Sequence, residues 1–235
     1  MYTPPLNECF DYPVIERIDG KIRLYVTHSG NLPSVTTILS KTEDPDTKAG
    51  LKAWRDWVGD AKADEIVKEA CDIGTLMHEN LENRLIGAEE HKGTMPMRKL
   101  ARRMADVIQK NAWPNINEVW SQEKPLFYEG LWAGTSDLIG VHDGTPAIMD
   151  YKNSRQPKKW EKIKNYRLQC AAYALAHNQM FGTDIKKGVI FVCVRKDPEN
   201  LVYQEFVVEG QDFEDAKVEW IERVEQYYTQ FETKE

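Results

Sequence analysis

The sequence predicts an α/β protein in which a helical N-terminal part precedes a sheet-forming C-terminal part. From residue 46 to 112, apolar residues recur at the three- and four-residue steps of amphipathic helices. From residue 113 to 208, alternating or continuous apolar runs between turn residues are typical of strands, and a last helical pattern closes the chain. A chain of 235 residues with 41% hydrophobic content can bury one sizeable core. We therefore expect one domain over 1–235, with hairpin and helices to about 112 and a catalytic core over about 113–235.

The first elements are a hairpin and a short helix. Residues Val14 to Thr27 read as a hairpin about Asp19-Gly20, which we interpret as structural. A helix should follow Pro33, with Ser34 as the N-cap whose hydroxyl satisfies a free backbone amide. Alternatively, the hydroxyls of Ser34 and Thr36 bind phosphate at this helix N-terminus.

Two amphipathic helices are expected over about 46–59 and from residue 61 onward. In the second helix, Gly74, His78 and Glu82 recur at four-residue steps and form a stripe beside the apolar one. Gly74 costs about 1 kcal/mol relative to alanine in a helix interior, so we expect a close approach of another segment there. His78 is either a packed or solvated residue, or a metal ligand.

A basic loop and helix follow over residues 91–112. This segment is interpreted either as a solvated helix face or as a wall for phosphates. Its basic residues are Lys92, Arg98, Lys99, Arg102 and Arg103.

The most informative stretch is 134–154, because two alternating runs flank Asp143-Gly144, a strong hairpin signal. If these are the two turn residues, counting back along both strands sets Asp137 directly opposite Asp150. Strand side chains alternate between faces, so Lys152 points the same way as Asp150. The same face carries Ile139, Val141 and Ile148.

Opposed carboxylates repel each other, and a bound cation would compensate. Two aspartates that hold a divalent cation beside a lysine suit metal-dependent cleavage of phosphodiesters. The alternative is a solvated strand edge, but a face with three aliphatic residues should be buried, where charges need a partner or a metal. The preceding strand, about 119–127, carries Glu123, either an outer ligand or an exposed residue.

A basic segment follows the hairpin. Residues 152–167 contain seven basic residues and the single acid Glu161, interleaved with Trp160 and Tyr166. This composition suits DNA phosphates and stacked bases, although a surface charge run with no partner is the common alternative. Pro157 is expected to begin a helix. The candidate DNA-binding residues are Ser34, Thr36, Arg102, Asn153, Ser154, Arg155, Lys158, Lys159 and Lys162.

The order of these motifs resembles the PD-(D/E)XK nuclease superfamily and, within it, the RecB-like exonucleases. The segments PSVTTIL, GTLMHENLE, GTSDLIG, IMDYKNS and LQCAAYA, in this order, are similar to those of the mitochondrial genome maintenance exonuclease family and its phage-borne relatives. The resemblance implies a restriction-endonuclease-like core, with a mixed central sheet flanked by helices. It also implies dependence on Mg²⁺ or Mn²⁺ and cleavage of DNA with a preference for single-stranded ends.

The resemblance also assigns roles to residues. It implies that Lys152 is the catalytic lysine and that Gln169 and Tyr173 are a supporting pair. The implied metal ligands are His78, Asp137, Asp150 and the backbone carbonyl of Tyr151. The sequence departs from the superfamily name at Ser136, where the name has Pro, and has Asp150 where many members have Glu.

Charge, cysteine spacing and the lack of long apolar runs bear on other classes of function. The net charge of −7 superficially disfavours nucleic acid, but much of the acid lies from Glu199 onward. The four cysteines form no C-x-x-C pair, so no iron-sulfur cluster is expected. Without a long apolar run or a targeting signal, we expect no membrane partner and a cytoplasmic location in a bacterium or phage-infected host. Protein partners are unknown from the sequence.

Two alternatives to an exonuclease stay open. A restriction-type endonuclease of the same superfamily would not need a free DNA end. A non-catalytic nucleic-acid-binding protein is disfavoured, because binding alone gives no reason to oppose Asp137 and Asp150.

Overall fold

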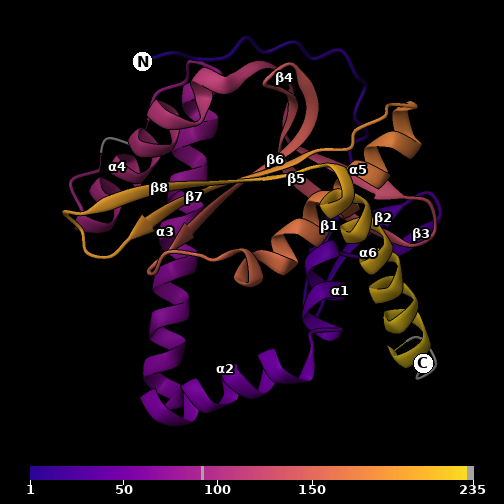
Figure 1. Cartoon of the computed structure of the whole chain (residues 1–235), viewed down its shortest axis with the longest axis horizontal. Helices are drawn as coiled ribbons and strands as arrows, with labels where there is room; N and C mark the ends of the chain where they lie inside the picture. The colour runs from indigo at the N-terminus through magenta and orange to yellow at the C-terminus, as the bar shows by residue number, and fades with distance from the viewer. Residues whose placement is uncertain (91–92, 232–235) are drawn as a thin grey trace.

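The structure is a computed structural model that describes residues 1–90 and 93–231. A three-stranded sheet and four helices precede a five-stranded sheet, and two further helices pack on that sheet (Figure 1). The elements are β1 (Glu16–Asp19), β2 (Arg23–Thr27), β3 (Gly30–Pro33), α1 (Val35–Lys41), α2 (Pro45–Val58), α3 (Asp60–Leu85), α4 (Pro96–Asn111), β4 (Ile116–Tyr128), β5 (Trp132–His142), β6 (Thr145–Ser154), α5 (Lys164–Phe181), β7 (Gly188–Arg195), β8 (Leu201–Val208) and α6 (Gly210–Phe231), with 3-10 turns at Trp113–Asn115 and Trp160–Ile163.

The central sheet has the strand order β4-β5-β6-β7-β8 and is mixed. Only β6 and β7 are parallel, so the chain must cross over between them, and α5 makes this crossover. Helices α5 and α6 cover one face of the sheet, whereas α3 and α4 cover the other (Figure 1). The predicted class, a mixed sheet flanked by helices, is confirmed.

The alternation of side chains along β5 and β6 builds a core on each face of this sheet. Ile139 and Ile148 are fully buried on the side of α5 and α6. Their neighbours Leu138 and Met149 are buried on the side of α3 and α4. The β5–β6 hairpin is therefore anchored by packing on both faces of its strands.

The hairpin of β5 and β6 has the predicted register. His142 pairs with Thr145, and the pairing continues to Leu138 and Met149. The two turn residues have positive φ, 47° at Asp143 and 74° at Gly144, as a type I′ turn requires. This register carries Asp137 and Asp150 to the next opposed position along the two strands.

The N-terminal hairpin turns later than predicted and gains a third strand. Asp19 is the last paired residue of β1 and lies opposite Arg23, so the turn is made by residues 20–22. The next strand, β3, adds antiparallel to β2 and was not predicted. Asp19 is thus a strand residue, and its side chain lies on the same face of the sheet as that of Arg23.

The prediction that Pro157 begins a helix is wrong, since α5 begins at Lys164. The side chain of Gln204 explains the difference. Its Oε1 accepts a hydrogen bond from Lys158 N at 2.8 Å, and its Nε2 donates to Lys158 O at 3.1 Å. This pair of bonds holds the backbone extended at the point where the helix was expected.

Helix α3 approaches β6 closely at Gly74, as predicted. A Cβ atom added there would lie 2.7 Å from Asn153 Nδ2, which itself donates to the carbonyl of Ala70 at 3.2 Å. Beyond this contact α3 projects past the sheet, and α2 crosses back from its far end toward α1 (Figure 1). No residue of α2 is buried. Among the helices described here, none is long and apolar enough to cross a membrane.

Candidate active site

A cavity of about 650 Å³ lies where α3, β5, β6 and α5 meet the three-stranded sheet. Most residues implicated by the resemblance line it, although His78 and Tyr173, the first and last of them, are 95 positions apart in the chain. The lining includes the predicted residues Ser34, Thr36, His78, Asp137, Lys152, Gln169 and Tyr173, and also Arg17, Arg23, Tyr25, Glu79, Glu82, Glu123, Gly134 and Thr135. Asp150 is not in the lining and is only 2% exposed.

Acidic side chains occupy three adjacent strands beside this cavity. Gln122 pairs with Leu138 and Lys124 with Ser136, so Glu123 lies across from Asp137 on one side. Extending the β5–β6 register by one residue beyond its last pair, Leu138–Met149, puts Asp150 across from Asp137 on the other side. Glu123 has a φ of 48°, a value uncommon for a residue with a side chain.

The backbone of Tyr151 fixes two of the side chains. His78 Nε2 donates to Tyr151 O at 2.9 Å, and Tyr151 N donates to Asp137 Oδ2 at 2.8 Å. The other ring nitrogen of His78, Nδ1, then lies 3.6 Å from Asp137 Oδ2 and 3.9 Å from Glu123 Oε1. This geometry leaves Nδ1 as the atom that faces the carboxylates.

The donor atoms fit a divalent cation. His78, Glu123 and Asp137 each offer one ligand atom, and these atoms all lie within 4.8 Å of one another. Carboxylate oxygens suit Mg²⁺ and Mn²⁺, and an added imidazole nitrogen favours Mn²⁺. Of the four predicted ligands, this cluster contains His78 and Asp137. It replaces the other two with Glu123, for which the sequence left a ligand role open.

Asp150 forms a buried ion pair with Lys152. Lys152 Nζ lies 2.5 Å from Asp150 Oδ2, while neither carboxylate oxygen receives a well-oriented hydrogen bond from the described residues. Burial, reinforced by the charge of Asp137 and opposed by Lys152, raises the pKa of Asp150 to about 6. Burial alone would lower the pKa of Lys152, but the charges of Asp150 and Asp137 outweigh it and raise that pKa. A buried carboxylate with so few donors is a suitable neighbour for a cation.

The acidic surroundings also change the protonation of two residues on α3. Burial acts to lower the pKa of His78, but the charges of Asp137 and Glu123 prevail and raise it to about 9. Burial and the nearby charge of Glu123 raise the pKa of Glu82 to about 7. Both shifts report a concentration of negative charge at this end of the cavity.

The predicted supporting pair lies on α5, at the edge of the cavity. Gln169 Nε2 donates to Tyr173 OH at 3.4 Å, one helical turn away. The ring of Tyr173 packs against Gly134, where an added Cβ would lie only 2.7 Å from Tyr173 Cε1. Gly134 on β5 therefore lets this ring approach the strand that carries Asp137.

Ser34 caps α1, as the first interpretation of that residue predicted. Its Oγ accepts a hydrogen bond from Thr37 N at 3.0 Å, and Ser34 is 2% exposed. Thr36 is exposed and lines the cavity.

The remaining DNA-binding candidates lie outside the cavity lining, and several have partners within the protein. Ser154 Oγ donates to Gln156 O at 2.7 Å, and Arg155 forms an ion pair with Glu69. Arg102 Nη2 donates to Gly93 O at 3.1 Å. Asn153 bonds to α3 as described above, Lys158 is half-buried, and Lys159 and Lys162 are exposed. Lys92 lies outside the described residues.

Arg17 and Arg23 were missed by the sequence analysis, which interpreted their hairpin as structural only. The signal was present, because the opposed pairs Arg17–Tyr25 and Asp19–Arg23 place four polar side chains on one face. A hairpin with such a face must turn it either to solvent or to a polar cavity.

Comparison with known proteins agrees with this fold. The profile of the PD-(D/E)XK nuclease superfamily matches residues 48–234, and the chain belongs to this superfamily. Its members generally use divalent metals. Mitochondrial genome maintenance exonuclease 1 of Mus musculus is 24% identical over 179 residues, which is 70% of this chain, and the chain spans about half of that protein's length. A crystal structure of a candidate exonuclease from Eubacterium rectale has the same fold, with a TM-score of 0.51, 16% identity and coverage of 68% of this chain and 65% of that one.

Proposed function

We propose that this protein is a divalent-metal-dependent DNA exonuclease that prefers single-stranded ends. The observation that carries the proposal is the convergence of His78, Glu123 and Asp137 on one cavity, near the buried pair of Asp150 and Lys152. The exonuclease named among the similar proteins supports the same reaction type.

Different residues of the site would have different roles in phosphodiester hydrolysis. A divalent cation held by His78, Asp137 and Glu123 or Asp150 would offset phosphate charge and activate a water. Lys152 is charged beside Asp150, so it would donate hydrogen bonds to a non-bridging phosphate oxygen. The Nε2–H of His78, held by Tyr151 O, directs Nδ1 toward the carboxylates, and a bound cation would displace the Nδ1 proton that they stabilise.

The dimensions of the site support a single-stranded substrate. A cavity of about 650 Å³ is within the range of about 300–1,000 Å³ that is usual for small-ligand sites. Such a space suits one or two unpaired nucleotides better than a duplex. DNA contacts by Lys158, Lys159 and Lys162 would lie outside this cavity and are part of the same proposal.

The test is degradation of end-labelled single-stranded, duplex and circular DNA with Mg²⁺ or Mn²⁺. We expect linear single strands to be degraded fastest and circles to resist, whereas cleavage of circles would indicate an endonuclease. Asp150→Asn should abolish cleavage by the purified protein without unfolding it, because it removes a charge at a metal site. Near wild-type turnover in this variant would reject the assignment of the site.

A further inference from the structure

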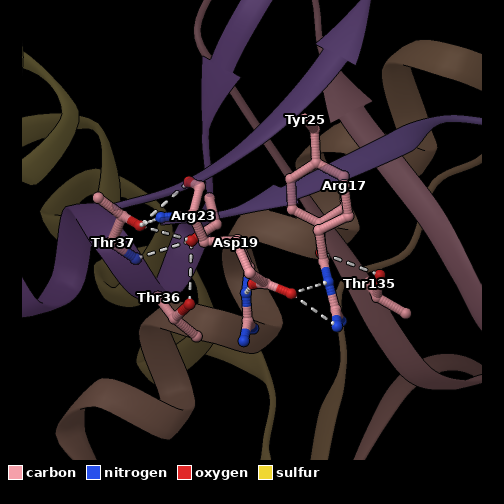
Figure 2. Close-up of polar contacts among 8 residues, drawn as sticks. Arg17, Asp19, Arg23, Tyr25, Thr36, Thr37 and Thr135 are labelled. Carbon is pink, nitrogen blue, oxygen red and sulfur yellow. Dashed lines mark hydrogen bonds and ion pairs between the residues drawn. The ribbon is translucent and has the colours of Figure 1, made fainter. Parts of the chain in front are cut away.

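Two arginines share one carboxylate on the wall that the β1–β2 hairpin contributes to the cavity. Arg17 donates from Nε to Asp19 Oδ2 at 3.0 Å, with Nη2 also 3.0 Å from that oxygen, and Arg23 donates from Nε to Asp19 Oδ1 at 2.8 Å (Figure 2). One acid thus holds two guanidinium groups together. The cluster carries a net charge of +1.

Both guanidinium groups keep hydrogen-bond donors for a ligand. Each group has five N–H donors, and Asp19 occupies only a few of them. Over residues 1–90 and 93–231, no other side chain pairs with either group. Arginine forks match the oxygens of a phosphate.

The hairpin that carries these arginines is fixed to the catalytic strands. The backbone N and O of Arg23 both bond to Thr37 Oγ1 at 3.2 Å. Tyr25 OH lies 3.0 Å from Thr135 Oγ1, two residues before Asp137 (Figure 2). The arginines are therefore held at a set position relative to the carboxylates, as a binding site requires.

A purely structural role explains the cluster poorly. The side chains of Arg17, Asp19 and Arg23 are 49%, 53% and 42% exposed, and ion pairs this exposed contribute little to stability. Elsewhere the lining carries the carboxyl groups of Glu79, Glu82, Glu123 and Asp137 against the cations of Lys152 and His78, so it is net acidic and would repel a phosphate chain. The arginine wall is where a second phosphate would be attracted.

We infer that Arg17 and Arg23 together bind one phosphate of the DNA strand, beside the phosphate that is cleaved at the carboxylates. The inference rests on the proposed function. Asp19 is a positioning residue that keeps the two like charges together before DNA arrives. The phosphate bound here sets how far the strand enters the cavity.

The test measures binding of a fluorescent single-stranded oligonucleotide to the full chain in EDTA, over a series of salt concentrations. Arg17→Gln/Arg23→Gln should weaken binding by about tenfold, the loss expected for charge-assisted hydrogen bonds to one phosphate. The slope of log K against log salt should flatten by about 0.7. Arg17→Lys/Arg23→Lys keeps the charges and should retain the slope with weaker binding.

The control is Lys21→Gln, which removes one positive charge, against two in the double variant, from the turn of the same hairpin and is not in the cavity lining. It should leave the slope unchanged. If the double glutamine variant matches this control in affinity and slope, the inference is wrong. If the double glutamine variant has a lower melting temperature than the control, the double lysine variant decides. A double lysine variant that binds DNA as tightly as wild type would then overturn the inference.

Two further comparisons identify the phosphate and separate this inference from the proposed function. If the phosphate is terminal, wild type binds phosphorylated ends more tightly than hydroxyl ends, and the double glutamine variant loses this difference. If the phosphate is internal, the variant loses the same affinity for all forms of the DNA. With metal present, the variant should raise KM and largely spare kcat, since the contact is made equally in the ground and transition states. A wild type that binds DNA through these arginines yet cleaves none would reject only the proposed function.

Discussion

At the scale of single residues, His177 shows how burial alone sets a protonation state. Its ring is fully buried within an aromatic cluster of Phe10, Trp120 and Phe181. Thr183 Oγ1 donates to Asn178 Oδ1 and so accepts from His177 Nδ1 at 2.8 Å, which leaves Nε2 to accept from Tyr12 OH at 3.0 Å. The neutral ring is satisfied on both nitrogens, whereas the protonated ring would have to displace a donor.

This arrangement predicts an acid-sensitive fold. Burial lowers the pKa of His177 to about 4. The unfolded chain, with a histidine pKa of about 6.5, therefore binds a proton between pH 6.5 and 4 that the folded protein does not bind. The free energy of unfolding should fall as the pH drops from about 6.5 to 4, by up to about 3 kcal/mol from this group. Urea unfolding at a series of pH values measures the fall.

His177→Gln should reduce the pH dependence over that range while lowering stability at pH 7. Tyr12→Phe is the matched control, because it removes one hydrogen bond but keeps the titrating ring. It should lower stability and retain most of the pH dependence. An unaltered pH profile in His177→Gln would show that other groups cause the acid sensitivity.

Sequence reasoning at this scale succeeded where a role depends on neighbours along the chain. Ser34 caps a helix through an atom three residues away, and counting along one hairpin gave the register that ends at Leu138 and Met149, one position before Asp137 and Asp150. It could not assign Arg17 or Glu123. Their roles depend on which distant wall each side chain faces, and this is set by the docking of whole elements.

At the scale of elements, α3 is held to β6 through a contact that only glycine permits. The space at Gly74 is filled by the amide of Asn153, which bonds to the α3 backbone. The prediction that another segment approaches Gly74 closely is confirmed, and that segment is β6 at Asn153. The same contact also sets the position of His78, one turn further along α3, relative to β6. The start of α5 was mispredicted because the bond pair between Gln204 and Lys158 joins positions 46 residues apart.

Two glycine substitutions should therefore have opposite effects. Gly74→Ala gains about 1 kcal/mol of helix propensity but overpacks the contact and displaces a hydrogen bond, for a net loss of about 1–2 kcal/mol. Gly50→Ala, in α2 with nothing within 4 Å of its added Cβ, should stabilise the fold by about 0.5–1 kcal/mol. Melting temperatures should move by about 2–4 °C per kcal/mol in opposite directions. Equal shifts of one sign would refute the packing argument.

At the scale of the whole molecule, the fold brings together residues that lie far apart in sequence. The periodicity of the two halves was sufficient to predict the α/β class, and the register of one hairpin was predicted by counting from its turn. The three-stranded sheet was only partly foreseen, since β3 has no apolar alternation to mark it. That the whole chain forms one domain stays a prediction.

Metal binding provides a measure of the site that does not depend on activity. A cation that binds only the folded state stabilises it by about 2.7 kcal/mol at 100 times its Kd, which should raise the melting temperature by about 5–10 °C. Mn²⁺ should act at lower concentration than Mg²⁺, because His78 adds a nitrogen to the oxygen ligands. Thermal melts across a titration of each metal measure both effects.

The ligand sets differ in what they predict for single substitutions. His78→Ala and Asp137→Asn should each lose most of the metal-induced shift, since both residues belong to the predicted set and to the observed cluster. Glu123→Gln should weaken the shift only if the cluster seen here binds the metal, and Asp150→Asn only if the ligands implied by the resemblance do. Asp150→Asn should also hold or raise the melting temperature without metal, because burial disfavours the charge of Asp150 more than the ion pair with Lys152 favours it. If His78→Ala lowers the melting temperature but keeps the full shift and the Mn²⁺ advantage, the histidine is a packing residue and not a ligand.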